Sequence, residues 1–384
     1  MEHLSDRENE EKEQRARRAA RIARMRREKQ RQEMRRLMIK RYLPLGAGVL
    51  CVIIIMIVII MVFGRPDKDE IQQTKVDAQE EQTDSKEPLK VSTEDKAAED
   101  GLNIMKEEEF PVYSFELAPD SVTIYSEEVV STNAILVDAG TDTIVASKGA
   151  NERICPASMT KVLTVLVAAE QIKEADLDNA FTMTTGITDY AYVNDCSSVG
   201  FLDGEKVTVR DLFYGTVLAS GADAAVGLAT YIAGSPEAFV DMMNEKLVQM
   251  GLSDSAHFTN CVGLYDEEHY CTVYDMAVMM KAAMENELCR EFLSAHTYTT
   301  TSTVEHPDGI DISNWFLRRV EDKDTGGEVL GAKTGYVVQS KNCAVSYGVF
   351  GEGAAYICVT AGSTSSWRCI YDHVEIYNRY VRAK

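Results

Sequence analysis

The stretch "CPASMTKVLTVLVAAEQI" (residues 155–172) is the most informative segment of the chain, because it combines a helix start with a serine and a lysine. Ser158 and Lys161 stand three positions apart, directly after Pro156, in the only S-x-x-K pattern of the sequence. Proline is common at the first position of a helix, and the apolar residues that follow recur with helical spacing. The side chains expected to face inward are Val162, Leu163, Val165, Leu166 and Ala169. Since residues three apart share a helix face, the pattern predicts a serine nucleophile with a lysine base one turn away.

A lysine that acts as a base needs a lowered pKa, which burial or a second cation can supply. The segment "GEVLGAKTGYV" (residues 327–337) contains such a cation at Lys333. On an edge strand beside the serine, Lys333 would bind a substrate carboxylate and help to lower the pKa of Lys161. Thr334 would hydrogen-bond the same carboxylate, and Gly335 would leave room for the substrate backbone.

The patterning from residue 126 onward predicts one mixed domain, residues 126–384. Two β-branched runs around "AGTD" (residues 139–142) predict a hairpin, and two further strands are expected at residues 342–350 and 354–362. Helices are predicted at residues 158–172, 210–234, 235–251, 273–293 and 365–381. Strands at both ends with helices between them indicate an α/β fold of the α+β type, in which helices flank an antiparallel sheet and also form a helical cluster.

The N-terminal part predicts a membrane anchor. Residues 1–42 are basic, and residues 43–63 are uncharged and rich in Ile and Val. That apolar length matches a helix across about 30 Å of hydrocarbon, and it exceeds the roughly 7–15 residues of a signal-peptide core. The positive-inside rule then places the basic tail in the cytoplasm and the rest outside the cell membrane. The tail is either solvated or in contact with anionic lipid headgroups, and we favour lipid contact.

Residues 64–125 read as an acidic, flexible extracytoplasmic stalk, because they are poor in aromatic residues and cannot bury enough apolar surface. A more apolar patch at residues 110–125 is the part of the stalk best suited to pack on the domain. The formal net charge of the chain is −21, which argues against nucleic acid as a partner of the domain. The nine cysteines and six histidines are scattered without zinc-site spacing, so we expect free thiols and no cofactor or metal.

Three motifs together resemble those of penicillin-binding proteins and serine β-lactamases. They are Ser158-x-x-Lys161, Ser220-Gly221 and Lys333-Thr334-Gly335. More specifically, residues 130–365 resemble the D-alanyl-D-alanine carboxypeptidases of the low-molecular-weight penicillin-binding group, through long segments such as "GEKVTVRDLFYGTVLASGADAAVGLA" and "GLYDEEHYCTVYDMAVM". The resemblance implies the DD-peptidase/β-lactamase-like fold, with an antiparallel sheet and an all-helical subdomain.

The resemblance also implies an acyl-enzyme mechanism on peptidoglycan stem peptides that end in D-Ala-D-Ala. Ser158 would attack the carbonyl between the two D-alanines while Lys161 takes its proton, and Ser220 would relay that proton to the leaving amine. β-Lactams would inhibit the protein by acylating the same serine. Lys333, Thr334 and Gly335 would bind the substrate, and the backbone N–H groups of Ser158 and Tyr336 would form the oxyanion hole.

Two positions depart from the family pattern. Ala222 stands where the second motif usually has asparagine, and Val337 stands where a Ser or Thr often follows the K-T-G motif. A lost hydrogen bond of this kind is worth about 0.5–1.5 kcal/mol, so we expect slower turnover or altered substrate preference. Asp223 is expected to be a structural helix residue and not a substitute for the missing amide.

Two other functions remain open at this point. A β-lactamase shares the same serine and lysine logic, but no E-x-x-L-N stretch lies between Ser220 and Lys333. A catalytically weak β-lactam-sensing or wall-binding protein would fit the anchored topology and Ala222. The presence of Ser158, Lys161, Ser220 and Lys333 together argues for an active enzyme.

Overall fold

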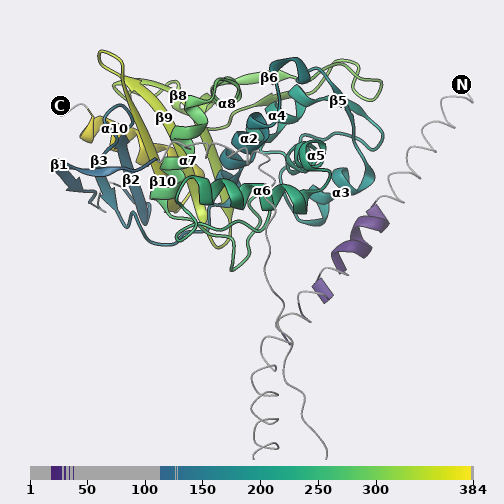
Figure 1. The fold of residues 1–384 in the computed structure, drawn as a ribbon, viewed down its shortest axis with the longest axis horizontal. Coiled ribbons are helices and arrows are strands. Elements are labelled where there is room, and N and C mark those ends of the chain that lie inside the picture. Colours follow the sequence, from purple (N-terminus) through teal and green to yellow (C-terminus); the bar gives the residue numbers. More distant parts are fainter. Residues whose placement is uncertain are drawn as a thin grey trace, which may run out of the picture. The chain divides into compact units, whose positions relative to one another are not determined.

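The computed structural model describes residues 19–27, 30, 31, 34, 38, 113–125, 127 and 129–381 (Figure 1). The chain divides into two units, residues 1–26 with 110–384 and residues 27–109, and the folded domain belongs to the first. Within the described ranges no helix is both long and apolar enough to cross a membrane. The predicted span at residues 43–63 lies outside the described residues, as do most of the predicted tail (1–42) and the stalk up to residue 112.

A six-stranded sheet forms one half of the domain, in the strand order β1-β3-β2-β10-β9-β8. The strands are β1 (Glu116–Thr123), β2 (Asn133–Asp138), β3 (Thr143–Lys148), β8 (Gly327–Val337), β9 (Lys341–Phe350) and β10 (Ala354–Ser363). Neighbouring strands pair antiparallel, as predicted, except that β1 runs parallel to β3. The placement of residues 116–123 in a flexible stalk is therefore wrong, because β1 uses the sheet edge to pair its backbone groups. At the other edge lies β8, which carries the K-T-G motif.

Helices cover both faces of the sheet, which explains why its central strands are continuously buried. On one face lie α9 (Leu317–Val320) and α10 (Ser366–Tyr380), and on the other lie α7 (Val273–Glu285) and α8 (Glu287–Leu293). Alternate residues of β2 enter different cores: Leu136 packs on the α10 side, and Ile135 and Val137 pack on the α7 side. Period-2 alternation thus divides one strand between two apolar layers.

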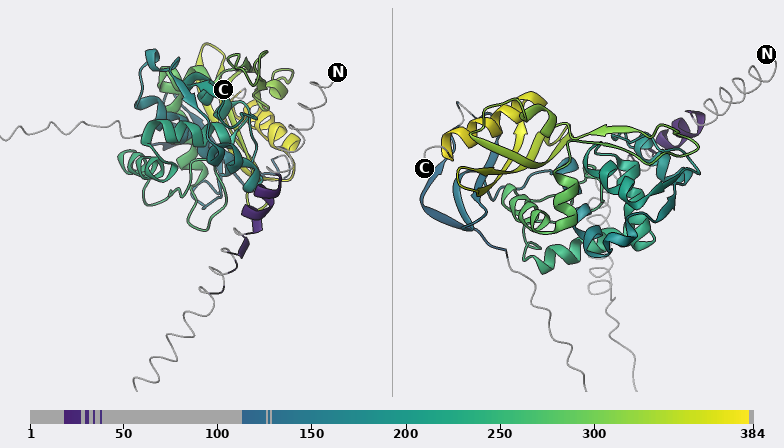
Figure 2. Two further views of the ribbon diagram at one scale, coloured as in Figure 1. Left: turned by 90° about the vertical axis from the view of Figure 1, so that its right-hand side faces the viewer. Right: turned by 90° about the horizontal axis from the view of Figure 1, so that it is seen from above.

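The second half of the domain is a helical subdomain around α2 (Figure 2). It contains α2 (Lys161–Glu170), α3 (Thr185–Val193), α4 (Val209–Val217), α5 (Ala222–Ala233) and α6 (Pro236–Gln249), with the 3-10 turns η1 (Ala157–Thr160) and η2 (Glu174–Asp176) and the short strands β4 (Ala180–Thr182) and β5 (Lys206–Thr208). Neighbours on several sides bury α2 from Lys161 to Ala169. The predicted inward face is confirmed, and the opposite face is buried as well. This central position fixes the end of α2 that carries the nucleophile.

Two predicted helices are each broken into two in the structure. The stretch 210–234 forms α4 and α5, separated by Ser220 in a left-handed conformation with φ of 53°. Residues 273–293 form α7 and α8. Between them Asn286 leaves the helical conformation, and its side-chain oxygen caps α8 by accepting a hydrogen bond from the Cys289 backbone N–H. Both segments were predicted as single helices from the spacing of their apolar residues, and the turn signal of the Ser220-Gly221 dipeptide was overlooked. The first break is the one that matters for function.

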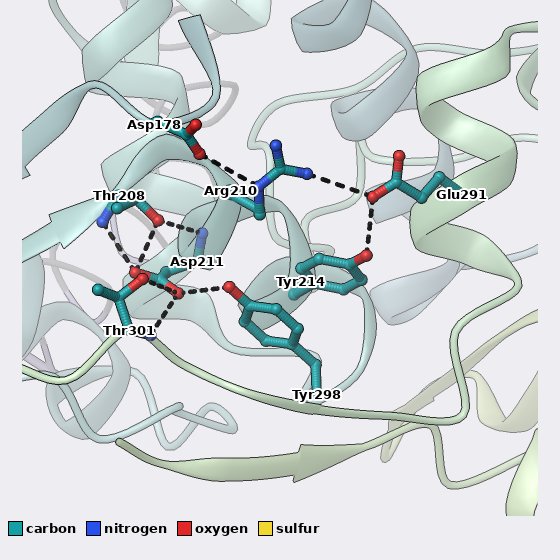
Figure 3. A network of polar contacts seen from close by, with 8 residues as sticks. All are labelled: Asp178, Thr208, Arg210, Asp211, Tyr214, Glu291, Tyr298 and Thr301. Carbon is teal, nitrogen blue, oxygen red and sulfur yellow. Dashed lines mark hydrogen bonds and ion pairs between the residues drawn. The ribbon is translucent and has the colours of Figure 1, made fainter. Parts of the chain in front are cut away.

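A network of hydrogen bonds joins α4 to the segment between α8 and α9, which contains the short strands β6 (Thr297–Thr299) and β7 (Asp311–Ser313) (Figure 3). Asp211 is fully buried and closes a capping box with Thr208 at the start of α4. The same carboxylate accepts hydrogen bonds from the Tyr298 hydroxyl (2.9 Å) and the Thr301 backbone N–H (2.9 Å). Tyr298 in turn stacks on Tyr214 of α4. These contacts attach the β6–β7 segment to the helical subdomain.

Candidate active site

Ser158 lies on the 3-10 turn η1, which leads directly into α2. Ala157, just before it, has φ of 46°, a left-handed conformation that residues other than glycine rarely adopt. The turn packs against β8 and β9, which hold it in this conformation. Strained backbone of this kind is typical of functional sites, where surrounding packing over-determines the geometry. The half-buried hydroxyl of Ser158 is thus presented at a fixed point between sheet and helices.

The Lys161 side chain reaches the serine as its spacing predicted. Its Nζ lies 3.1 Å from Ser158 Oγ and 2.7 Å from the backbone carbonyl of Val262. Only 2% of the residue is exposed. Burial lowers the pKa of Lys161 to about 8, since an apolar environment disfavours the charged amine. A neutral lysine at this position can accept the proton of the serine hydroxyl.

Lys333 lies on β8 with its Nζ 2.8 Å from Ser220 Oγ and 2.9 Å from the Thr334 carbonyl. It is also 2% exposed. Its pKa is held well below the usual value by burial first and by the positive charge of Lys161 second. The repulsion acts on Lys333, whereas the lowered pKa of Lys161 comes from burial, so the predicted effect of Lys333 on Lys161 is not seen. Because of the left-handed break at Ser220, the hydroxyl of the second motif meets the lysine of the third.

The edge strand β8 lies against η1, which carries Ser158 and is called the nucleophile turn below. Gly335 makes this close approach possible. A methyl group at Gly335 would lie 2.8 Å from the Pro156 carbonyl oxygen and 3.0 Å from the backbone nitrogen of Ser158. Thr334 and Gly335 line the same cavity as Ser158, together with the exposed Tyr336. The structure therefore brings all seven predicted site residues to one region, with Lys333 behind Ser220.

The loop that supports Lys161 was not predicted from the sequence. Asn260 holds it, because its Oδ1 accepts hydrogen bonds from the backbone N–H groups of Val262 (3.2 Å), Gly263 (2.7 Å) and Leu264 (2.9 Å). Gly263 has φ of 85°, and a methyl group there would lie 1.8 Å from the carbonyl oxygen of Ala157. The short N-x-x-G pattern was the available signal for such a turn.

A second element that the sequence did not predict is the loop of residues 194–200, which forms the opposite wall of the cavity. We call it the wall loop. Asp223 is fully buried and holds this loop: its carboxylate accepts hydrogen bonds from Ser198 Oγ (2.7 Å) and from the backbone N–H groups of Val199 (2.9 Å) and Gly200 (3.0 Å). The expectation of a structural residue is confirmed in this form. Ala222, beside it, is buried and offers no polar group.

These elements enclose a cavity of about 330 Å³. Its lining residues come from η1 and the start of α2, residues 194–197 of the wall loop, Ser220, the loop of residues 262–264, Trp315 before α9, strands β8 and β9, and the start of α10. They include Ser158, Lys161, Ser220, Thr334, Gly335 and Trp315. Across the described part of the chain, no cluster of three or more His, Cys, Asp or Glu is arranged to hold a metal ion. Each described cysteine is a free thiol.

Comparison with known proteins agrees with this geometry. The family model described as D-alanyl-D-alanine carboxypeptidase matches residues 120–364. The chain belongs to this family. The carboxypeptidase DacF of Bacillus subtilis is 30% identical over 236 residues, which cover 62% of this chain and 58% of the relative. The match thus spans less than two thirds of that relative's length. A carboxypeptidase of Streptomyces strain K15 is 28% identical, covering 65% of this chain and 86% of its own.

Solved structures of the family are similar in fold. The crystal structure of the Streptomyces K15 DD-transpeptidase has a TM-score of 0.60 and 27% identity, covering 67% of this chain and 98% of its own. The carboxypeptidase DacD of Francisella tularensis has a TM-score of 0.59 and 25% identity, covering 67% of this chain and 71% of its own. The expected DD-peptidase fold is confirmed for the described domain.

Proposed function

We propose that the protein is a serine-type D-Ala-D-Ala carboxypeptidase that removes the terminal D-alanine from peptidoglycan stem peptides and is inhibited by β-lactams. The observation that carries this proposal is the contact of 3.1 Å between Lys161 Nζ and Ser158 Oγ, with the lysine buried and its pKa lowered to about 8. With that pKa, about one lysine in ten is neutral at pH 7 and able to act as a base.

Acylation begins when Ser158 Oγ attacks the carbonyl carbon of the penultimate D-alanine. Lys161 takes the hydroxyl proton, and the carbonyl oxygen becomes an oxyanion. The backbone N–H groups of Ser158 and Tyr336 are the proposed donors to this oxyanion, because the nucleophile turn and β8 lie together at Gly335. Collapse of the tetrahedral intermediate breaks the peptide bond and leaves the acyl group on Ser158 as an ester.

The leaving D-alanine needs a proton on its amine. Ser220, whose hydroxyl accepts a hydrogen bond from Lys333, would relay to this amine the proton that Lys161 took from Ser158, which leaves Lys161 neutral again. Thr334, on the cavity wall, would bind the terminal carboxylate, and Lys333 would assist through its hydrogen bond to Ser220. A water molecule then attacks the ester carbonyl; the neutral Lys161 accepts a proton from the water and returns it to Ser158 Oγ as the ester bond breaks, which releases the shortened peptide and restores the Ser158 hydroxyl.

One relative's name suggests a different acceptor. The K15 structures are named DD-transpeptidase, and an amine acceptor in place of water would give transfer instead of hydrolysis. Ala222 favours a further alternative, a slow β-lactam-sensing or wall-binding protein, because no amide is present there to position the substrate. The acylation chemistry is the same in all three, and they differ in the fate of the ester.

We also propose that the chain is a single-pass protein of the cell membrane, anchored through residues 43–63, with its catalytic domain outside and its N-terminus in the cytoplasm. The support is the uncharged apolar stretch and the basic residues that precede it. Accessibility of the domain to an added protease in intact cells, compared with lysed cells, tests this orientation.

The deciding experiment for function uses the full chain in detergent and intact-protein mass spectrometry, with Ser158→Ala as the control. A penicilloyl adduct on Ser158 together with D-alanine release from a D-Ala-D-Ala peptide would support the carboxypeptidase. Products that appear only with an added amine would indicate a transpeptidase. A stable adduct without any turnover would indicate a sensing protein, and rapid loss of the adduct with destroyed penicillin a β-lactamase. A folded protein without adduct would refute the assignment of Ser158.

A further inference from the structure

One half-buried and two exposed aromatic rings form a ridge beside the active-site cavity. The chain has only two tryptophans, and although they are distant in sequence, the centroids of Trp315 and Trp367 lie 6.0 Å apart. Tyr371, one turn further along α10, stacks on Trp367 at 6.4 Å with an interplanar angle of 28°. Trp367 is 46% exposed and Tyr371 is 44% exposed. We call Trp315, Trp367 and Tyr371, with Arg319 between them, the aromatic ridge.

Arg319 holds the ridge in one arrangement. Its guanidinium carbon lies 4.1 Å from the centroid of the Trp315 ring and 5.6 Å from that of Trp367. Its Nη1 also donates a hydrogen bond to the Trp315 carbonyl (3.2 Å). A planar cation that stacks on aromatic rings restricts their rotation while it keeps free N–H donors at the edge. The ridge is therefore a preorganised surface with apolar faces and a polar border.

The ridge is attached to the catalytic strand and continuous with the cavity. Asn314, the residue before Trp315, donates through its side-chain amide to the Ala332 carbonyl (2.9 Å), directly next to Lys333 on β8. Trp315 itself lines the cavity that contains Ser158, as does Ser366 beside Trp367. A ligand that reaches Ser158 and extends out of the cavity on this side would pass over the aromatic ridge.

The chemistry of the ridge fits a sugar ring. A pyranose presents an apolar face of C–H groups, which packs on a flat aromatic ring, and an equatorial border of hydroxyl and acetamido groups, which accepts hydrogen bonds from a guanidinium. Tyrosine and tryptophan suit such half-polar contacts because they combine a large apolar body with a polar end. Arginine supplies several donors in a fixed plane. An aliphatic ligand would use the apolar faces but not this polar border.

We propose that the aromatic ridge is a saccharide subsite, which binds a sugar of the glycan strand that carries the stem peptide under attack at Ser158. This inference rests on the proposed function, since that function supplies a substrate whose peptide is joined to a sugar. The subsite would make the protein prefer stem peptides attached to glycan over free peptides. The preference would be set at Trp367, Tyr371 and Arg319, outside the residues that carry out the chemistry.

The first test measures binding without catalysis. Because both tryptophans belong to the ridge, all of the chain's tryptophan emission reports on it. Titration of the full chain in non-ionic detergent with the peptide-free N-acetylglucosamine–N-acetylmuramic acid disaccharide should give a saturable change in emission. Tyr371→Ala should weaken that binding about tenfold, the effect expected for loss of one aromatic contact. Tyr125→Ala, which removes an exposed tyrosine elsewhere, should leave it unchanged.

The second test compares D-alanine release from a free pentapeptide and from the same peptide on the disaccharide. Trp367→Ala and Tyr371→Ala should lower kcat/KM about tenfold for the glycan-linked substrate only. Equal loss on both substrates, or no loss on either, would overturn the subsite. So would an emission change produced by anionic lipid vesicles but not by the disaccharide, which would mean a membrane-facing ridge. If the wild type binds the disaccharide in a Tyr371-dependent way but releases no D-alanine, the proposed function fails and the subsite stands.

Discussion

The sharpest prediction concerns Gly263, a residue that touches the nucleophile turn without taking part in the chemistry. A methyl group at this position would lie 1.8 Å from the Ala157 carbonyl oxygen, against an ordinary contact of 3.4 Å or more. Gly263→Ala must therefore move one of the two backbone segments by about 1.6 Å. Since a shift of about 1 Å in a reacting group can cost roughly a hundredfold in rate, we expect acylation of Ser158 to slow by at least that factor.

The matched control is Gly234→Ala. Gly234 ends α5 with φ of 79°, close to the 85° of Gly263, and a methyl group there would meet no atom within 4 Å. Both substitutions impose left-handed backbone on alanine, which costs about 1–2 kcal/mol, and for a domain of this size each 1 kcal/mol lowers the melting temperature by roughly 2–4 °C. Only Gly263→Ala adds the collision with Ala157.

The assay is the rate of covalent labelling of the full chain by a fluorescent penicillin, measured together with thermal unfolding. Gly234→Ala should label at the wild-type rate despite its lower melting temperature. Gly263→Ala should label at least a hundredfold more slowly at a temperature where it remains folded. If a folded Gly263→Ala protein labels within threefold of the wild type, the contact between this loop and the nucleophile turn does not control the geometry of Ser158.

Three further predictions follow from the same site. The penicillin acylation rate should rise with pH to a half-maximum near pH 8, because Lys161 with a pKa of about 8 acts only when neutral; a flat profile between pH 6 and 9 would contradict its role as base. Lys161→Met should abolish labelling while leaving the free energy of unfolding in urea equal or higher, since an apolar side chain replaces a buried amine; a strongly destabilised variant would show that the lysine is mainly structural. Asp223→Asn should lower the free energy of unfolding by about 1–3 kcal/mol, because its amide group would face the hydrogen-bond donors of Ser198 and Gly200. It should also slow labelling by penicillin. Asp241→Asn, at an exposed position, should change neither stability nor labelling.

Much of the site was predictable because its motifs are local. The spacing of Ser158 and Lys161 is a property of a helical turn, and it survived although Ser158 lies on a 3-10 turn and not in α2 itself. Lys333 was expected on an edge strand beside the serine, because it would there reach a substrate carboxylate, and β8 does lie at an edge of the sheet. The family resemblance added Ser220, whose role no local pattern indicated.

The errors have a common physical cause. Residues 210–234 were predicted as one helix from their apolar spacing, yet the chain turns at Ser220, where Gly221 is packed against Val199 too closely for any side chain. The parallel pairing of β1 with β3 was also missed, because the more apolar patch at residues 110–125 indicates packing on the domain but not the strand that accepts it. In both cases a contact distant in sequence overrides the local preference of the chain.

By itself the sequence determined the nucleophile and its base, since three residues on a helical turn bring two side chains together in almost any context. It also determined the β-branched runs that form the strands of a sheet buried on both faces. Only the tertiary structure decided the state of the base. The Val262 carbonyl that contacts Lys161 is 101 residues away, and the pair of Lys333 and Ser220 spans 113 residues. Burial is a property of everything packed around a group, so the lowered pKa of Lys161 exists only once the whole domain has folded.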